Sequence, residues 1–479
     1  MEKDFVVYEG NIATHDASPF YGQIVIGRKS GIILDVSEGN SKYSHDGKFG
    51  SSCLIFPGMG DVHIHAREDE TRNQVHKEEY ATAGNSALNG GVVHVSAMPN
   101  TPNPVTTKEY FEWHRKRVGQ INHPVSILNY VGIGENTFPM EGIDVPYKLF
   151  LGPSVGGLFF RDPEGVKNSL ARYRGKKVSF HVEDDSVLEK SKRGRTHTDR
   201  RPVECVERGL EYLLPMIEEF EIEAKLCHWS TGGRSFDMIG EHRERAKKAG
   251  LPYTLLEVSP LHLMFDTSMT AADPSLWLKI QMNPAVQSKQ DRNELIKGLK
   301  TGFIDLLATD HAPHTMEEKH AAFAKFKTQF PDLANVQIAK KLKMEQPNLY
   351  LETCLENGTS GAPWLDTYAN VCAWLMEEHN FSPQDIARVA SYNPGVFANQ
   401  FLKDQFEGVD FGKGFGKIEA GYMGSLTVLN LDKPQIINAR DLKTKVGWSP
   451  LEGMEFSGGL ETAIIRGENM TGKFVESNV

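Results

Sequence analysis

Both ends of the chain have the pattern of short β-strands. Near the start, β-branched and apolar residues alternate with glycine in the stretches DFVVYEG (4–10) and GQIVIGRKSGIILDV (22–36). The same pattern returns near the other end in GSLTVLNL (424–431), PQIINA (434–439) and ETAIIRGENM (461–470). We therefore expect residues 1–56 and 418–479 to meet and form one small β-sandwich domain.

The middle of the chain, residues 57–417, alternates short apolar runs with amphipathic segments. The predicted strands are Val92–Ala97, Val125–Tyr130, Tyr147–Leu151, Lys177–His181, Ala224–His228, Tyr253–Val258, Leu278–Met282 and Ile304–Ala308. Helical spacing occurs between several of them, as in EYLLPMIEEFEIE (211–223) and RSFDMIGEHRERAKKAG (234–250). Such alternation predicts an α/β fold with parallel strands, and a (β/α)8 TIM-like barrel is the leading candidate.

One segment departs from this alternation. Residues 316–348 are charged and helical in pattern, and the sequence between Lys319 and Asp366 is long for a connection in a barrel. We expect this segment to lie on top of the barrel as a solvated surface helix.

Composition narrows the functional class. Hydrophobic residues make up 39% of the 479 residues, and the formal net charge is −10, which favours an enzyme of small metabolites over a nucleic-acid binder. No apolar run is long enough to span a bilayer, and the first residues lack a signal-peptide pattern. The five cysteines are scattered and lack metal-binding spacing, which predicts buried thiols in a reducing, cytoplasmic compartment.

The stretch GDVHIHAREDE (60–70) contains the first candidate chemistry. On a strand, residues i and i+2 face the same side, so His63 and His65 would project together, followed by Arg67 if the strand continued. Paired imidazoles are a plausible half of a metal site. Alone, an HxH pair is a weak indication.

Later strands add further candidates near their carboxyl ends: Lys148, His181, His228 and Asp310. Each has an ordinary structural explanation, as a surface lysine, a core histidine or a helix cap. Together they match a barrel active site, which collects residues from the ends of several strands. A lysine beside a divalent cation would be repelled, unless carboxylation by CO2 converted it into an anionic carbamate that bridges two metals.

With these residues in view, the chain resembles the cyclic amidohydrolases and, among them, the dihydroorotases. The resemblance covers nearly the whole length and rests on DVHIHAR (61–67), MPNTPNPVT (98–106), YKLFL (147–151), HVED (181–184), QMNPAV (281–286), ATDHAPHTMEEK (308–319), SYNPG (391–395) and WSPLEG (448–453). The order of these motifs is the family's order.

The resemblance implies a metal site and a substrate site. It implies one or two zinc ions held by His63, His65, His181, His228 and Asp310, with a carboxylated Lys148 as the bridge. It implies substrate contacts from Arg67, Asn100, Asn283, His314, Ser360 and Gly361. Asp310 would be the catalytic base and acid, and a homo-oligomer and association with aspartate carbamoyltransferase would be expected.

The implied reaction is the reversible cyclisation of N-carbamoyl-L-aspartate to L-dihydroorotate in pyrimidine biosynthesis. Dihydropyrimidinase, hydantoinase and allantoinase share the metal ligands, but their substrates lack the α-carboxylate that Arg67 and His314 would bind. A catalytically inactive interaction protein is a second alternative, although every ligand position is filled. The family usually continues Glu-Pro-Gly after HxHxR, whereas this chain reads Glu68-Asp69-Glu70, so the geometry of that loop stays open.

Overall fold

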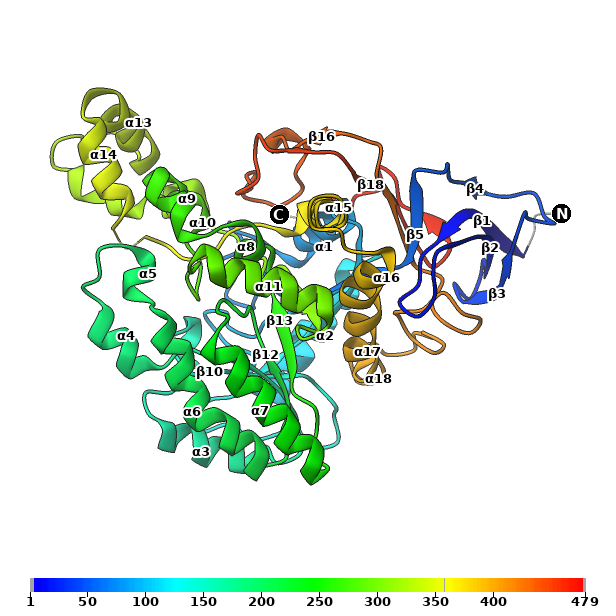
Figure 1. Cartoon of the computed structure of the whole chain (residues 1–479), viewed down its shortest axis with the longest axis horizontal. Helices are drawn as coiled ribbons and strands as arrows, with labels where there is room; N and C mark the ends of the chain where they lie inside the picture. The colour runs from blue at the N-terminus through cyan, green and yellow to red at the C-terminus, as the bar shows by residue number, and fades with distance from the viewer. Residues whose placement is uncertain (1–3, 357, 477–479) are drawn as a thin grey trace.

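A computed structural model describes residues 4–356 and 358–476. A barrel occupies the centre, a β-sheet lies at one end of the long axis, and a small group of helices lies at the other end (Figure 1). Among the described residues, no helix is both long and apolar enough to cross a membrane.

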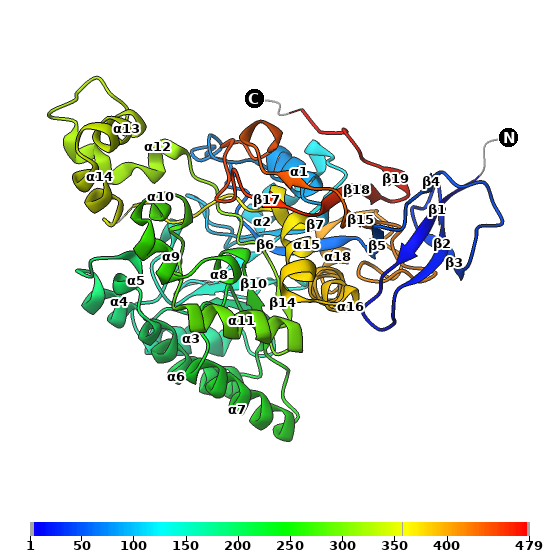
Figure 2. The same ribbon diagram turned by 45° about the horizontal axis from the view of Figure 1, so that its top comes forward.

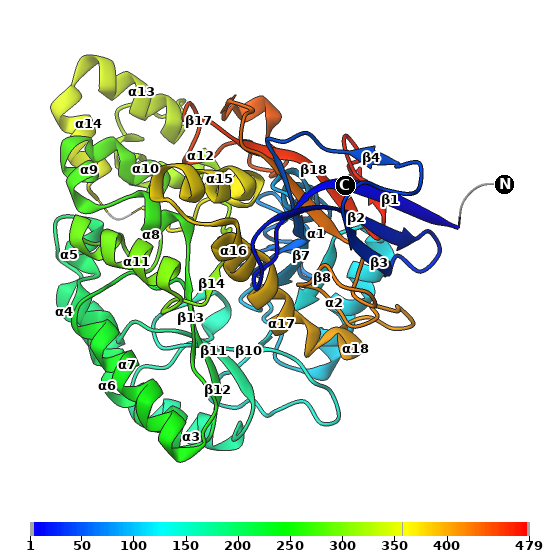
Figure 3. The same cartoon turned by 45° about the vertical axis from the view of Figure 1, so that its right-hand side comes forward.

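The two chain ends form one composite β domain, as the sequence pattern predicted, and its strands belong to a single hydrogen-bonded sheet. Its eight strands are β1 (Phe5–Ile12), β2 (Phe20–Gly27), β3 (Ile33–Glu38), β4 (Gly47–Lys48), β5 (Cys53–Pro57), β15 (Leu426–Asn430), β18 (Gly459–Ile465) and β19 (Glu468–Asn469). Strand β15 pairs antiparallel with β5, so that Thr427 lies opposite Phe56 and the two chain ends are joined. Figure 3 shows the blue N-terminal strands beside the red β18.

This sheet has a hydrophobic core of its own, separate from that of the barrel. The core includes Tyr8, Ile24, Ile55, Val428 and Ile464, so strands from both chain ends contribute to it. A separate two-stranded ribbon, β16 (Gln435–Ile436) with β17 (Glu455–Phe456), lies in the C-terminal segment. The boundaries of the composite domain at 56 and 418 stay a prediction.

The barrel consists of parallel strands whose apolar residues are buried, as parallel sheets require. The strands are β6 (Met59–Ile64), β7 (Val92–Ala97), β8 (Ser126–Asn129), β9 (Val131–Gly132), β10 (Tyr147–Phe150), β11 (Lys177–His181), β12 (Glu223–Leu226), β13 (Leu255–Val258) and β14 (Leu306–Leu307). The last strand meets the first where Ile64 bridges His311 and the His65 N–H donates to the His311 carbonyl at 2.7 Å. The closed barrel brings residues as far apart in sequence as His65 and Asp310, 245 positions, to one mouth.

Helices follow most strands and cover the outside of the barrel. The longer ones are α1 (Tyr80–Asn89), α2 (Lys108–Ile121), α3 (Pro163–Arg172), α6 (Val203–Glu219), α7 (Arg234–Ala249), α11 (Lys289–Thr301) and α15 (Tyr368–His379). The shorter ones are α4 (Asp185–Ser191), α5 (His197–Arg200), α8 (Pro260–Met264), α9 (Thr267–Ala272), α10 (Trp277–Ile280), α16 (Pro383–Ile386), the π-helix η5 (Ala387–Tyr392), α17 (Asn393–Asn399) and α18 (Leu402–Gln405). The helices predicted over 211–223 and 234–250 are confirmed as the end of α6 and as α7.

One predicted strand is wrong. Residues Leu278–Met282 lie mostly in helix α10, which buries Trp277, Leu278 and Ile280. A short apolar run cannot by itself distinguish a strand from a buried helical turn. The eight places in the barrel are filled once β6, the strand that contains His63, is counted and β8 and β9, which only Tyr130 separates, are taken as one place. No place was left for this run.

The expectation of a solvated surface helix after residue 316 is also wrong. Residues 316–354 form a small subdomain of α12 (Met316–Lys319), the 3-10 helix η3 (Ala321–Phe326), α13 (Asn335–Glu345) and α14 (Pro347–Cys354). Phe323, Ile338, Leu342 and Tyr350 pack together there, and Leu278 of the barrel joins them. The segment thus buries a core between its own helices, and Figure 2 shows α13 and α14 apart from the helices around the barrel.

Candidate metal centre

A cavity of about 370 Å³ opens at the carboxyl ends of the barrel strands. Its lining includes His63, His65, Arg67, Asn100, His181, His228, Asn283, Asp310, His314, Ser360 and Gly361. These are all the candidate site residues from the sequence except Lys148, which lies in the wall beneath them. The placement is that of TIM-barrel active sites. We refer to this cavity as the mouth pocket.

Three ligand-type side chains converge at the floor of the mouth pocket. The Asp310 Oδ1 atom lies 3.0 Å from His65 Nε2 and 3.2 Å from His63 Nε2. One ligand atom from each of the three residues falls within 4.8 Å of the other two, and all three residues are buried. Two imidazoles and a carboxylate at this spacing form a suitable donor set for a divalent metal ion such as zinc.

A buried carboxylate fixes the orientation of His63. The Nδ1 atom of His63 lies 2.6 Å from Glu257 Oε1, which leaves Nε2 to face Asp310. Glu257 also accepts the main-chain N–H of His228 at 3.1 Å and pairs with the ammonium of Lys225. Carboxylates that hold the second nitrogen of a ligating histidine are the usual support of metal sites.

A second carboxylate supports the other pair of histidines. His181 Nδ1 lies 2.9 Å from His228 Nε2, while His181 Nε2 lies 2.8 Å from Glu183 Oε2. Glu183 in turn pairs with Arg201. Neither Glu183 nor Glu257 was predicted from the sequence, although Glu183 stands two residues after His181 and so could have been found by its spacing.

Lys148 is buried beneath these side chains. It is the second residue of β10 rather than the last, its exposed fraction is 0%, and its Nζ has no hydrogen-bond partner among the described residues. Its positive charge acts on His63, His228 and Asp310, where it contributes to the pKa of each side chain. Its ammonium lies 5.1 Å from the centre of the Phe150 ring. A buried ammonium without a hydrogen-bond acceptor among the described residues is costly, and it lies where a further metal ligand would be useful. The donor set therefore fits a metal centre.

Burial favours the neutral form of three histidines of the site. It is the main cause that holds the pKa values of His63, His65 and His228 well below the usual range, and nearby positive charges from Lys148 and Arg67 lower them further. A metal ion binds the neutral imidazole, so the environment favours the form that can ligate.

Unusual backbone conformations gather at the site. Arg67, His228 and Asp310 have φ angles of 60°, 37° and 51°, in the left-handed region that non-glycine residues rarely adopt. Such conformations persist where the surrounding structure enforces them, which is common at active sites. For Arg67 this means that β6 ends at Ile64, and the side chain reaches the pocket through a turn rather than along a continued strand.

Polar groups without partners surround the cluster. Arg67 Nη2 lies 3.2 Å from His314 Nε2, and Arg67 Nε has no hydrogen-bond partner among the described residues. Asn100 donates its Nδ2 to the Ser154 hydroxyl at 3.2 Å, which leaves Asn100 Oδ1 unpaired. Asn283 Oδ1 is unpaired as well. Buried polar atoms normally have partners, so these atoms indicate a ligand that supplies them.

One wall of the mouth pocket is a tight backbone turn at Ser360 and Gly361. The Gly361 N–H donates to the Gln281 carbonyl at 2.8 Å, and the φ angle of Gly361 is 128°. A Cβ atom at this position would meet the Ala312 carbonyl at 2.4 Å, so only glycine fits. The C-terminal segment braces the same region, because Trp448 Nε1 donates to the His314 carbonyl at 2.7 Å.

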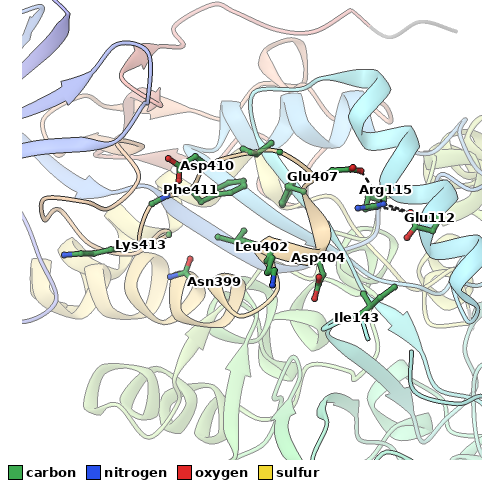
Figure 4. Close-up of a pocket in the computed structure, with 16 residues that line it drawn as sticks. Glu112, Arg115, Ile143, Asn399, Leu402, Asp404, Glu407, Asp410, Phe411 and Lys413 are labelled. Carbon is green, nitrogen blue, oxygen red and sulfur yellow. Dashed lines mark hydrogen bonds and ion pairs between the residues drawn. The ribbon is translucent and has the colours of Figure 1, made fainter. Parts of the chain in front are cut away.

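A larger cavity, of about 610 Å³, lies on the flank between α2 and the segment after α18 (Figure 4). We refer to it as the flank cavity. Its charged side chains have partners close by: Arg115 pairs with Glu112 at 2.7 Å, and Asp404 accepts the Asp144 N–H at 2.8 Å. No polar side-chain atom that lines it is both buried and unpaired among the described residues. Its larger volume does not make it the better candidate.

Comparisons with known proteins were made for the sequence and for the fold. No family model matches the chain. A protein named dihydroorotase from Pyrococcus furiosus is 26% identical over 92% of this chain and 87% of its own length. Another from Bacillus licheniformis is 27% identical over 91% of this chain and 90% of its own length.

Among solved structures, the chain resembles an L-hydantoinase (dihydropyrimidinase) from Arthrobacter aurescens. The TM-score is 0.77, with 19% identity, over 100% of this chain and 98% of that one. A D-hydantoinase (dihydropyrimidinase) from Thermus sp. gives a TM-score of 0.74 with 18% identity, over 98% of this chain and 97% of that one. The barrel with its composite terminal sheet is thus the fold of these proteins, as the sequence predicted.

Proposed function

We propose that this protein is a dihydroorotase, a metal-dependent hydrolase of a cyclic amide C–N bond. It would interconvert N-carbamoyl-L-aspartate and L-dihydroorotate, a step of pyrimidine biosynthesis. The sequence relatives support this assignment over most of the chain, because those named above carry that name. The contents of the mouth pocket support it independently.

The single observation that carries the proposal is the pairing of Arg67 and His314 beside the metal-ligand cluster. Both side chains are buried, lie 3.2 Å apart and line the same cavity as His63 and Asp310. A guanidinium makes charge-assisted and often bidentate hydrogen bonds to a carboxylate. The carboxylate of dihydroorotate would meet this pair while its ring amide lies over the cluster.

The unpaired amide oxygens complete the fit. Asn100 Oδ1 and Asn283 Oδ1 are acceptors without donors among the described residues, and both residues line the mouth pocket. A dihydropyrimidine ring carries two N–H donors that would satisfy them. The turn at Ser360 and Gly361 would close the remaining side of the ring.

The metal ligands are proposed to be His63, His65, Lys148, His181, His228 and Asp310, around one or two zinc ions. Lys148 would be N6-carboxylated. This change would replace its buried positive charge, which has no hydrogen-bond partner among the described residues, with an anionic carbamate that could bridge the ions. Bound metal supplies Lewis acidity and lowers the pKa of a water molecule toward neutrality.

The residues of the chain would then hold and move the reacting groups. Asp310 would accept the proton of the attacking water and return it to the leaving amide nitrogen, as a general base and acid. Arg67, Asn100 and His314 would fix the ring in one orientation, which contributes proximity. Glu257 and Glu183 would hold His63 and His181 in the tautomers that present a free nitrogen.

Another cyclic amidohydrolase activity is the second candidate, because the solved structures with this fold are hydantoinases. The proposed metal ligands do not distinguish this activity from that of a dihydroorotase, whereas the Arg67–His314 pair favours a substrate with a carboxylate. An inactive interaction protein is disfavoured because no position of the implied ligand set is missing.

The experiment is a substrate comparison with the purified full chain. Dihydroorotate should be hydrolysed, and hydantoin and dihydrouracil should be far poorer substrates. Equal turnover of all three would replace the dihydroorotase assignment with the broader one. For the bridge, Lys148→Ala should lose most activity and recover part of it when a short carboxylic acid is added, whereas wild-type turnover in that variant would contradict a bridging lysine.

A homo-oligomer, association with aspartate carbamoyltransferase and a cytoplasmic location belong to the same proposal. The location is supported by all five cysteines being free and buried, as expected in a reducing compartment. The first two rest on the resemblance to the family, and size-exclusion chromatography with and without the transcarbamoylase would test them.

A further inference from the structure

Lys319 is a buried cation that the proposed chemistry does not use. It ends helix α12, and only 2% of its surface is exposed. Its ammonium donates to three main-chain carbonyls: Thr359 at 2.7 Å, Gly361 at 2.9 Å and Gln281 at 3.1 Å. Within the described ranges it forms no ion pair, so carbonyl dipoles alone balance its charge. An arrangement this costly to bury calls for a role.

The three carbonyls belong to two segments that form the wall of the mouth pocket. One segment contains Ser360 and Gly361, and the other runs from Gln281 to Asn283. These segments are also joined directly, since the Gly361 N–H donates to the Gln281 carbonyl at 2.8 Å and Gln281 Nε2 donates to the Gly358 carbonyl at 2.6 Å. The ammonium of Lys319 therefore lies between the two segments, where carbonyl groups of both point toward it.

The same lysine is connected to the segment that carries Asp310 and His314. Its own N–H donates to the Thr315 carbonyl at 3.0 Å, and the Ala312 N–H donates to the Ala362 carbonyl at 3.0 Å. The neighbouring Glu318 lies 3.4 Å from His314 Nδ1. The side chain of Lys319 thus ties two of these stretches together, and its main chain continues the third, which carries Asp310 and His314.

We propose that Lys319 is a positioning residue, whose ammonium holds the Thr359–Gly361 turn and the Gln281–Asn283 segment as the rigid wall of the substrate pocket. The inference rests on the proposed function for its kinetic test. It concerns substrate binding and not the metal, because none of the three carbonyls belongs to a proposed metal ligand. The loss of the ammonium should loosen the wall and leave the metal cluster in place.

The test compares Lys319→Met with Lys340→Met. Methionine keeps the length of the side chain and removes the donors, and Lys340 is an exposed lysine on α13 of the same subdomain. We expect Lys319→Met to raise KM for dihydroorotate by about tenfold or more, the scale of lost hydrogen bonds to a charged group. Its kcat should stay within about threefold and its bound zinc should equal that of the wild type, as for a lost ground-state contact. Lys340→Met should match the wild type.

A second readout does not depend on turnover. Amide hydrogen exchange in a peptide covering 358–362 should be faster in Lys319→Met than in Lys340→Met, because the turn has lost its clamp. In Lys319→Ala, added propylammonium should lower KM again, while propanol of the same size should not. If Lys319→Met does not fold, Lys319→Gln carries the test, with a KM expected above that of the wild type.

An unchanged KM with unchanged exchange would overturn the inference, and so would loss of zinc together with a collapse of kcat. If the wild type does not act on dihydroorotate, the proposed function fails, but the exchange comparison still decides whether Lys319 holds the turn.

Discussion

The mouth pocket and the flank cavity differ in chemistry more than in size. The flank cavity is larger, at about 610 Å³ against about 370 Å³. In the flank cavity Arg115 pairs with Glu112 and with Glu407, whose side chain is 88% exposed, and no lining polar side-chain atom is both buried and unpaired among the described residues. In the mouth pocket, Arg67 Nε and Asn283 Oδ1 are buried and have no hydrogen-bond partner among the described residues.

The contrast shows what marks a functional site in a protein of this kind. A cavity whose polar groups are already paired gains little from a ligand, because any new hydrogen bond replaces an old one. A cavity with unpaired buried groups carries their desolvation cost until a ligand or metal supplies the partner. Buried polar atoms without hydrogen-bond partners among the described residues, together with a strained backbone at His228 and Asp310, therefore identify the mouth pocket as the functional site.

The largest expected effect is that of metal removal. Chelation should abolish activity, and purified protein should carry one to two equivalents of zinc per chain, measured by elemental analysis, as the proposed ligand set implies. His181→Ala should lower the metal content because it removes a ligand. Full activity in a rigorously metal-free preparation would contradict the centre, and Asp410→Asn in the flank cavity is the matched control that should keep its metal.

Next in size is the loss of the proposed base. Asp310→Asn keeps the shape of the side chain and should lower kcat by roughly 10²–10⁴-fold, the usual contribution of general acid–base catalysis. Steady-state kinetics at saturating dihydroorotate would measure it, beside Asp404→Asn as the flank control. A change confined to KM would instead assign Asp310 to binding.

The preference for a substrate with a carboxylate should depend on Arg67. The wild type should prefer dihydroorotate over dihydrouracil by at least ~10³ in kcat/KM, because a substrate without the carboxylate leaves a buried guanidinium unpaired. Arg67→Met should remove most of that preference by slowing the dihydroorotate reaction. Arg67→Lys should restore little, since a point charge does not reproduce the planar fork. An unchanged preference in Arg67→Met would exclude the residue as the carboxylate contact.

A smaller effect is expected at the carboxylates that support the ligating histidines. Glu183→Gln leaves a neutral group against His181 and should weaken metal affinity by about 10–100-fold, the usual loss for a carboxylate that supports a ligating histidine. Competition with a chelator of known affinity would measure this shift. Glu112→Gln is the matched change in the flank cavity, and equal affinity in both variants would show that Glu183 has only a structural role.

The smallest effect is expected at the flank cavity itself. Arg115→Met should leave kcat/KM unchanged and alter the free energy of unfolding by less than about 1 kcal/mol, the value of a partly exposed ion pair. Urea denaturation and the standard assay would measure both quantities. A fall in activity comparable to that of Arg67→Met would mean that the volume of a cavity, and not its unpaired polar atoms, indicates the functional site in this protein.

Much of the fold was predictable because its periodicity is local. The glycine-punctuated β pattern of the two ends and the strand–helix alternation between them predicted the barrel and the composite sheet. The failures also have local causes: the run at Leu278–Met282 was too short to separate strand from helix, and the segment after Met316 gave no indication that its helices would bury a core together.

The sequence alone determined which residue types stand near the strand ends, since His63, His65, His181, His228 and Asp310 could be read from motif and spacing. Only the tertiary structure decided what surrounds them. Closure of the barrel brings Glu257 against His63, leaves Lys148 buried without a hydrogen-bond partner among the described residues, and gathers three carbonyls around Lys319. These contacts join positions that are 38 to 194 residues apart. Such pairings leave no periodic trace along the chain, because they arise only when strands from distant segments close into one barrel.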